Sequence, residues 1–198
     1  MTIEFFAVWQ ELTIRIRPIL IIGKATGLRA CGSGWPAIST DGRWVGFTSS
    51  ANNLVAGDTN GEEDVFVRDL GNTTTQRVSI ATGGAEGTDG NSNYNKPVLS
   101  ADGRYVAFHS FAQNLVAGDT NAASDIFLHD RMTGTTTRVS VDSTGAEVHG
   151  DSLYPSISAD GRFVAFQSQA ADLVPSDTNS HQDIFVRDRL GATTDRVS

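Results

Sequence analysis

Three sets of oxygen-bearing side chains recur along the chain with the spacing Asp-x-Asn-x-x-x-Asp. The sets are Asp58, Asn60 and Asp64; Asp119, Asn121 and Asp125; and Asp177, Asn179 and Asp183. Oxygen ligands at positions one, three and seven of a turn built from small residues are typical of the start of a calcium loop. Glu62 adds a carboxylate to the first set, so we expect that set to be the strongest ion site of the three.

A hydrogen-bonding brace explains the same pattern without an ion. Asp and Asn at loop ends accept hydrogen bonds from nearby backbone N–H groups and tolerate left-handed backbone conformations. Side chains here supply about three to five of the six to eight oxygens that calcium needs. The glycine and glutamate of an EF-hand loop are missing from the spacing. Two interpretations therefore stay open: a brace, or a calcium site with a dissociation constant on the order of 0.1–1 mM.

Catalytic chemistry has little support in the sequence. The four histidines, at positions 109, 129, 149 and 181, show neither a metal-ligand spacing nor a partner nucleophile. The single cysteine, Cys31, excludes an internal disulfide and a multi-cysteine metal site. The chain has no Gly-x-Ser-x-Gly elbow and no phosphate-binding glycine loop. We therefore expect a protein that is not an enzyme.

The three sets belong to an internal repeat. Asn-Leu-Val-Ala-Gly-Asp-Thr-Asn occurs unchanged at residues 53–60 and 114–121, and an edited copy spans residues 172–179. Spacing within the unit is fixed, because Asp64, Asp125 and Asp183 each precede an arginine by 13 residues. Only the linkers between units differ in length, which is typical of exposed connections. Such repetition indicates an array of one structural unit.

Each unit predicts four strands, at about residues 37–39, 43–49, 64–69 and 74–80 of the first unit. An Asp-Gly-Arg sequence at residues 41–43, 102–104 and 160–162 predicts a tight turn after the first strand. Aromatic and β-branched residues dominate the strands, and no helical period occurs. Consecutive apolar residues such as Val65-Phe66-Val67 predict strands that are buried on both faces. Asp69, Asp130 and Asp188 close the third strand, where we expect ion pairs or caps, with Arg68 and Arg187 beside them.

The units resemble the TolB-like, WD-repeat-like β-propeller repeats of bacteria. The resemblance rests on Pro-x-[Ile/Leu]-Ser-x-Asp-Gly-Arg-x-Val-[Ala/Gly]-Phe-x-Ser, followed by Asp-[Ile/Val]-Phe-[Val/Leu]-x-Asp, three times between Trp35 and Ser198. It implies an all-β fold of three four-stranded antiparallel blades, at about residues 35–80, 81–141 and 142–198, in an open or partial propeller. It also implies protein–protein contacts and a periplasmic or extracellular setting.

Charge and the first residues limit the partners further. Fifteen basic and 23 acidic residues give a net charge of −8, which argues against nucleic-acid binding. No apolar run reaches the ~18 residues of a membrane span. Residues 1–34 lie outside the repeat and contain no convincing signal peptide. Leu28-Arg-Ala-Cys31 resembles a lipoprotein lipobox apart from Arg29, and the alternative is a poorly ordered or mis-started segment.

Three blades are fewer than the four to eight that typically close a propeller. Open apolar faces favour association, so we expect an incomplete arc that a homodimer would complete as a six-blade ring. The leading hypothesis is a non-enzymatic scaffold, calcium-stabilised or not, that binds a protein or glycan partner. Two alternatives stay open: the propeller part of a hydrolase such as a prolyl-oligopeptidase-type peptidase, and a truncated fragment without independent function.

Overall fold

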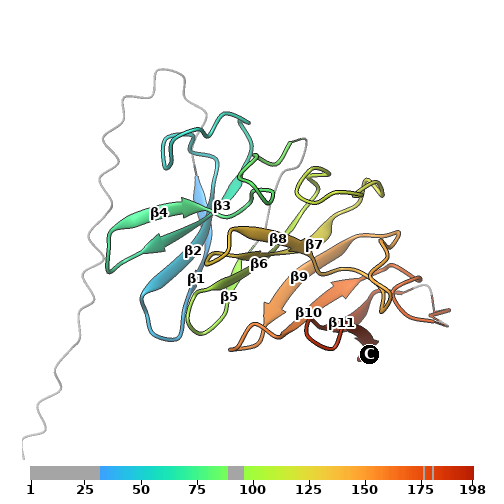
Figure 1. Cartoon of the computed structure of the whole chain (residues 1–198). Coiled ribbons are helices and arrows are strands. Elements are labelled where there is room, and N and C mark those ends of the chain that lie inside the picture. Colours follow the sequence, from blue (N-terminus) through green and yellow to red (C-terminus); the bar gives the residue numbers. More distant parts are fainter. Residues whose placement is uncertain (1–31, 89–95, 176, 180) are drawn as a thin grey trace, which may run out of the picture.

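The computed structural model describes residues 32–88, 96–175, 177–179 and 181–198, and twelve strands form three antiparallel sheets in it (Figure 1). Blade 1 contains β1 (Ser33–Ile38), β2 (Trp44–Ser49), β3 (Asp64–Asp69) and β4 (Thr74–Arg77). Blade 2 contains β5 (Val98–Leu99), β6 (Tyr105–Ser110), β7 (Asp125–Asp130) and β8 (Thr135–Arg138). Blade 3 contains β9 (Ser152–Ile157), β10 (Phe163–Ser168), β11 (Asp183–Asp188) and β12 (Thr193–Arg196).

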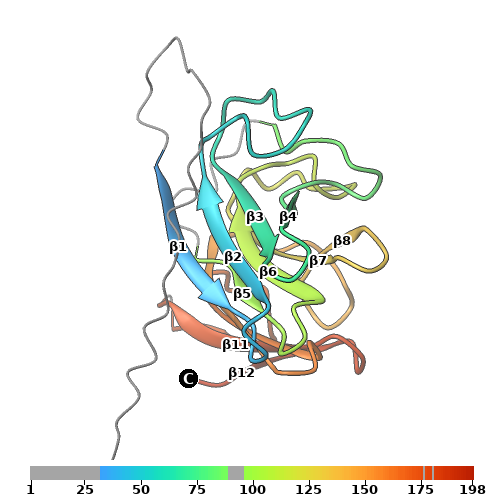
Figure 2. The same ribbon diagram turned by 90° about the vertical axis from the view of Figure 1, so that its left-hand side faces the viewer.

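Within each blade the strands lie in chain order, as Figure 2 shows for β1 to β4. The prediction of three four-stranded antiparallel blades is therefore confirmed. The first strands of the blades converge, because β5 contacts both β1 and β9. No helix in the described part of the chain is long and apolar enough to cross a membrane.

Two strand boundaries of blade 1 differ from the sequence-based expectation. β1 begins at Ser33 rather than near residue 37, because Ser33 Oγ donates a hydrogen bond to Ser49 Oγ and extends the pairing with β2. β4 ends at Arg77 rather than near residue 80, because the side chain of Ser79, not its backbone, accepts the next hydrogen bond, from the N–H of Val65. The lipobox-like sequence around Cys31 lies outside the described residues.

An irregularity interrupts the first strand of blades 1 and 3. In blade 1 it falls between Gly34 and Ala37, where the register against β2 shifts. Trp35 and Tyr154 occupy the same repeat position there, and their φ angles are 52° and 54°. A bulky residue in the left-handed region costs about 1–3 kcal/mol, so the surrounding sheet must hold this conformation. Both aromatic side chains remain exposed to solvent.

The hydrophobic core lies between blades rather than inside one of them. Between blades 1 and 2 it is formed by Val65, Val67, Val78, Val106, Phe108, Ala112, Leu115 and Phe127. Between blades 2 and 3 it is formed by Ala107, Ile126, Leu128, Val139, Val148, Val164, Phe166, Ala170, Leu173 and Phe185. Blades approach closely where side chains are small: a Cβ added to Gly46 would lie 2.7 Å from Leu99 Cδ1 of the next blade. Each blade is thus stabilised mainly by its neighbours.

Each blade junction contains an aromatic ring of one blade covered by the next blade. Trp44 of blade 1 packs against Gly103 of blade 2, and the guanidinium of Arg131 lies 3.8 Å from the ring centroid. Tyr105 of blade 2 packs in the same way against Gly161, beneath Arg189 at 4.5 Å. In both junctions the ring therefore packs against a glycine, which has no side chain to obstruct it, and makes a cation–π contact with an arginine of the next blade.

Candidate functional site

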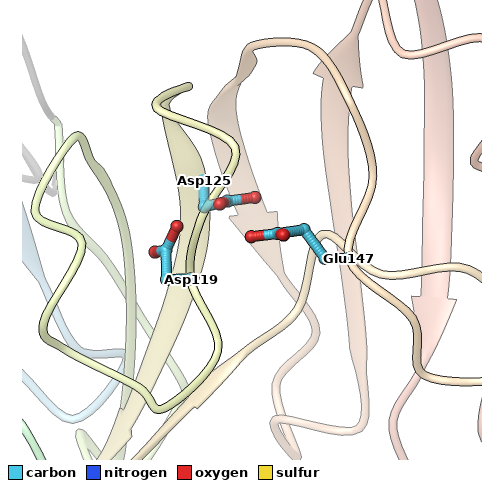
Figure 3. Close-up of side chains that lie close together, drawn as sticks. All are labelled: Asp119, Asp125 and Glu147. Atoms are coloured by element: carbon cyan, nitrogen blue, oxygen red, sulfur yellow. The ribbon is translucent and has the colours of Figure 1, made fainter.

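The repeated aspartates come together with a glutamate that lies further along the chain. In blade 2, Asp119 belongs to the loop between β6 and β7, and Asp125 begins β7. Glu147 arrives from the linker that follows β8. One carboxylate oxygen from each residue lies within 4.8 Å of the other two, and Figure 3 shows the three side chains turned toward one another.

An arginine neutralises this carboxylate cluster. Arg138, the last residue of β8, places its Nη1 atom 2.6 Å from Glu147 Oε1, 3.2 Å from Asp125 Oδ2 and 3.5 Å from Asp119 Oδ1. Its Nη2 atom donates a hydrogen bond to the carbonyl of Gly118. The guanidinium is charged at every physiological pH, so it provides the positive charge that buried carboxylates require.

Blade 1 repeats the cluster in full, and blade 3 repeats part of it. Arg77 Nη1 lies 3.2 Å from Asp58 and from Asp64, and 2.6 Å from Glu86. In blade 3, Arg196 pairs with Asp177 at 2.8 Å and Asp183 at 3.6 Å. Glu86 and Glu147 each follow their arginine by nine residues, whereas only two residues follow Arg196 in the sequence.

The asparagine of each set connects its loop to the second aspartate through hydrogen bonds. Asn121 Nδ2 donates hydrogen bonds to Asp125 Oδ2 and to the carbonyl of Val148, while its Oδ1 accepts one from the N–H of Ala123. Asn60 makes the corresponding bonds in blade 1, where its Oδ1 accepts the hydrogen bond of the Glu62 N–H. In blade 3, Asn179 binds Asp183 and the N–H of His181. These are Asx turns that fix the loop against the strand.

Burial and hydrogen bonding separate the pKa values within the cluster of blade 2. Burial raises the pKa of Asp119 to about 6, and the nearby charge of Asp125 adds to this against the effect of Arg138. Burial also acts on Glu147, but hydrogen bonds from Thr120 and Arg138 outweigh it and lower the pKa to about 2. In blade 1, a hydrogen bond from Thr59 is the main reason that the pKa of Glu86 falls to about 2.

The contacts described above for these loops are those of an ion-paired brace. A guanidinium stands between the carboxylates that a divalent cation would need, and the asparagine oxygen binds a backbone N–H. Calcium at these loops would therefore have to share or displace the charge of the arginine. Calcium binding stays a prediction. The residues that the spacing alone missed are Glu86 and Glu147, although the sequence Arg-x8-Glu occurs at both positions.

A second brace connects the turn after the first strand to the end of the third. Asp41 accepts hydrogen bonds from Ser39 Oγ and from the N–H of Arg43, as the turn prediction requires. Arg43 then binds both carboxylate oxygens of Asp69, at 3.0 and 2.9 Å. The same pair recurs as Arg104–Asp130 and Arg162–Asp188. Bidentate pairing of this kind fixes the geometry as well as the charge.

The arginines beside these aspartates in the sequence have other partners. Arg68 Nη1 donates to Thr75 Oγ1, and Arg187 Nη1 donates to Thr194 Oγ1 and to the carbonyl of Asp142. Successive side chains on a strand point to opposite faces of the sheet, so Asp69 pairs across the blade with Arg43 and not with its neighbour.

The described histidines are dispersed over the blades. His109 and His129 are buried on β6 and β7, and burial lowers the pKa of His129 to about 4, so it is neutral at pH 7. His149 lies on the surface, where its Nδ1 is 2.8 Å from Asp172.

The converging first strands surround an open hollow of about 390 Å³. It is lined by Pro36, Ala37, Ile38, Lys96, Val98, Leu99, Ser156 and Ile157. Ile38 is largely exposed there, and the exposed rings of Trp35 and Tyr154 belong to the same strands. We call this region the inner-strand surface. Its lining offers an apolar floor and one lysine from three different blades, and the ring of Tyr154 packs against His109 of blade 2.

Comparison with known proteins establishes the fold. No family model and no curated protein sequence matches the chain. TolB from Acinetobacter baumannii superposes with a TM-score of 0.51 at 20% identity, over 83% of this chain and 32% of that one. A TolB-type protein of Agrobacterium tumefaciens gives a TM-score of 0.51 at 18% identity, over 83% and 48% of the two chains. The acylaminoacyl peptidase of Pyrococcus horikoshii gives 0.49 at 15% identity, over 87% and 25%.

The chain thus has a TolB-like β-propeller fold with three blades, and spans about a third to a half of the length of the two TolB structures.

Proposed function

We propose that the chain is a non-enzymatic β-propeller scaffold that binds a protein partner on the inner-strand surface. The observation that supports this most directly is the exposure of apolar side chains, Ile38 above all, around a hollow to which all three blades contribute. Soluble proteins rarely leave a contiguous apolar surface open unless it binds something. Two ion-paired braces per blade hold the strands behind that surface.

Trp35 and Tyr154 support the same proposal from the backbone. Their left-handed conformation is unfavourable for an aromatic residue, and it recurs at one repeat position in two blades. Strain of this kind persists where the surrounding structure imposes it, and it is concentrated at functional sites. Aromatic residues are also enriched in protein interfaces. Lys96 stands at the equivalent position of blade 2 and would pair with an acidic group of the partner.

A selection experiment tests the proposal on the full chain. A random-peptide phage library is panned on the immobilised protein, and each recovered peptide is titrated by calorimetry. Ile38→Asp should abolish binding of the recovered peptides, because it places a charge in the apolar floor. Met132→Asp is the matched control, since Met132 is an exposed apolar residue in the turn after β7. Peptides that bind the Ile38→Asp variant as well as the wild type would contradict the proposal.

A glycan array, probed with the same three proteins, covers the other ligand class. If no peptide is selected and glycan binding depends on Ile38, the ligand of the inner-strand surface is a carbohydrate and not a protein. We also propose that the protein acts in the bacterial periplasm or outside the cell, which the resemblance of the repeat to TolB-like propellers supports.

Calcium stabilisation of the braced loops belongs to the same proposal and has its own test. The melting temperature is measured with excess EDTA and with millimolar calcium, because a ligand bound only by the folded state must raise it. Calcium sites in the wild type require a rise that Asp58→Ala and Asp64→Ala each reduce, because blade 2 keeps its own cluster. Arg138→Gln frees Asp119, Asp125 and Glu147 from their cation, so we expect its calcium-dependent rise to exceed that of the wild type.

A further inference from the structure

Blade 3 exposes a face that is buried in blade 2. Ile184 and Val197 are 41% and 66% exposed, whereas Ile126 and Val139, at the same repeat positions of blade 2, are 0% and 2% exposed. Blade 3 covers those two residues of blade 2. The sequence of blade 3 therefore retains an apolar face suited to a following blade.

Blade 1 partly exposes the complementary face, on which Phe66 is fully buried beside Phe47. Val45 and Phe47 of β2 are only half-buried, while Val106 and Phe108 at the same positions of β6 are fully buried against blade 1. A blade packs one of its faces on the preceding blade and the other on the following one. Within the described residues, the chain consequently carries both halves of one blade junction, one on blade 1 and one on blade 3, without a blade packed on either.

The aromatic ring and the glycine of the junction are also both present and unpaired. Phe163 of blade 3 stands where Trp44 and Tyr105 stand in the other blades, and it is 39% exposed. Gly42 of blade 1 corresponds to Gly103 and Gly161, and a Cβ built on Gly42 would meet nothing within 4 Å. The two internal junctions have a ring in that space.

Leu70 distinguishes the unpaired junction from the two internal ones. It occupies the repeat position of Arg131 and Arg189, whose guanidinium groups cover Trp44 and Tyr105. Leu70 is 53% exposed. A leucine cannot donate the hydrogen bonds of an arginine, but it can cover a phenylalanine ring. Leu70 and Phe163 are therefore matched in chemistry, apolar against apolar.

We propose that two copies of this chain associate head to tail, each placing Phe163 against Gly42 and Leu70 of the other. The proposal rests on the scaffold proposed above and names how its ring is completed. A contact between two different faces closes into a ring when the rotation fits. Two copies give two identical junctions and six blades, within the four to eight of known propellers. Three copies would give nine.

The junction between copies would rest on apolar contact more than the internal ones do. Internally, Thr136 and Thr194 bind the preceding linker through hydrogen bonds to Thr82 and Ser143. Among the described residues, no linker from an earlier blade precedes Thr75, the equivalent residue of blade 1; its Oγ1 accepts a hydrogen bond from Arg68, as Thr194 Oγ1 does from Arg187. Association should accordingly depend on protein concentration.

Sedimentation velocity of the full chain over 1 to 100 μM tests the proposal. We expect a concentration-dependent species of twice the 21.1 kDa monomer mass. Phe163→Glu and Leu70→Glu should each give a monomer, although the two residues lie on different blades. Leu70→Arg, which reproduces the internal junctions, should still dimerise, and so should the control Met132→Glu. Far-UV circular dichroism of every variant verifies that it is folded.

Mixing the two monomeric variants tests the head-to-tail arrangement itself. Phe163 of the Leu70→Glu chain can still meet Leu70 of the Phe163→Glu chain, so the mixture should recover a dimer that neither variant forms alone. A wild-type monomer at 100 μM, a dimer that survives Leu70→Glu, or growth into open polymers would each overturn the proposal. The peptide selection tests the inner-strand surface around Ile38, whereas sedimentation tests the outer faces of blades 1 and 3. Either the partner-binding proposal or the dimer proposal can therefore fail while the other holds.

Discussion

At the scale of single residues, an arginine at the end of the fourth strand connects three parts of each complete repeat. Arg138 pairs with a loop residue, Asp119, with the first residue of a strand, Asp125, and with a linker residue, Glu147. Its Nη1 atom lies near all three carboxylates at once. Removal of one member of a buried ion network costs more than its formation contributed, because unpaired charge is left behind.

Arg138→Gln should therefore lower the free energy of unfolding by about 3–5 kcal/mol. Arg196→Gln is the matched control within the chain, because Arg196 is exposed and pairs with two carboxylates instead of three. Its loss should cost about 1 kcal/mol or less. Urea denaturation of both variants measures the difference, and equal losses would show that the glutamate contributes nothing.

The pKa values of the cluster predict a stability maximum in mildly acidic solution. Glu86 and Glu147 have folded pKa values of about 2, below the ordinary 4.5, so their contribution is complete above pH 4.5 and is lost as the pH falls toward 2. Asp119 has a folded pKa of about 6, above its ordinary 3.8. Its contribution is complete below pH 3.8 and is lost as the pH rises through 6.

Denaturation by urea between pH 3 and pH 8 checks this prediction. Asp119→Asn should flatten the decline between pH 4 and pH 6 and leave the acid limb in place. Because burial also raises the pKa of Asp58, the double variant with Asp58→Asn should be flatter still. If the double variant lost stability between pH 4 and pH 6 as the wild type does, ionisable groups other than Asp58 and Asp119 would cause the decline.

Much of this site could be predicted from spacing, but its central contact could not. The Asp-x-Asn-x-x-x-Asp pattern and the 13 residues from Asp125 to Arg138 are both visible in the sequence. That the interval joins an ion pair depends on how β7 pairs with β8, which spacing alone does not reveal. Glu147 comes from a linker, whose path depends on hydrogen bonds such as that from Asn121 to the Val148 carbonyl.

At the scale of elements, the turn after the first strand is part of the junction between blades. Gly103 and Gly42 have nearly the same backbone conformation, with φ angles of 68° and 72°. They differ in what lies beside them: a Cβ on Gly103 would overlap the Trp44 ring, and one on Gly42 would meet nothing within 4 Å. Substituting each glycine by alanine therefore distinguishes the energetic cost of backbone strain from that of packing.

Gly42→Ala should cost about 1 kcal/mol, the price of a left-handed alanine. Gly103→Ala has the same strain and must also displace Trp44, for which overpacking adds about 1–3 kcal/mol. Chemical denaturation, performed at a concentration where the chain is monomeric, gives both values. Equal losses would mean that the ring moves aside freely and that the junction is loosely packed.

The strands themselves followed from local pattern, and their irregularities did not. Aromatic and β-branched runs identified β2, β3 and their counterparts, and the bounds of β3 agree with the expectation. The break in β1 was not foreseeable, because Trp35 has no local preference for a positive φ. That conformation is imposed by pairing with β2 on both sides of the break.

At the scale of the whole molecule, the three blades are not equally protected. Among the described residues, other blades cover blade 2 on both faces, and blades 1 and 3 on one face each. In repeat proteins, stability is approximately the sum of the units and of the interfaces between neighbours. The terminal blades, with one interface each, should open more often than the middle one.

Hydrogen exchange read by mass spectrometry should show this gradient. In dilute solution, amides of β6 and β7 should exchange more slowly than those of β2 and β10. At concentrations where the proposed dimer forms, β2 and β10 should gain protection while β6 and β7 change little. Equal protection of all three blades in dilute solution would contradict the view that each blade is stabilised separately by its interfaces with its neighbours.

The fixed spacing of the braces also determines how a gene for such a protein can change length. Recombination between the identical octapeptides at residues 53–60 and 114–121 would join the first aspartate of one blade to the second aspartate, the arginine and the glutamate of the next. Because Asp58 precedes Arg77, and Asp119 precedes Arg138, by the same number of residues, the hybrid blade would keep its ion pairs. One crossover therefore adds or removes a whole blade, and every intermediate gene encodes intact braces.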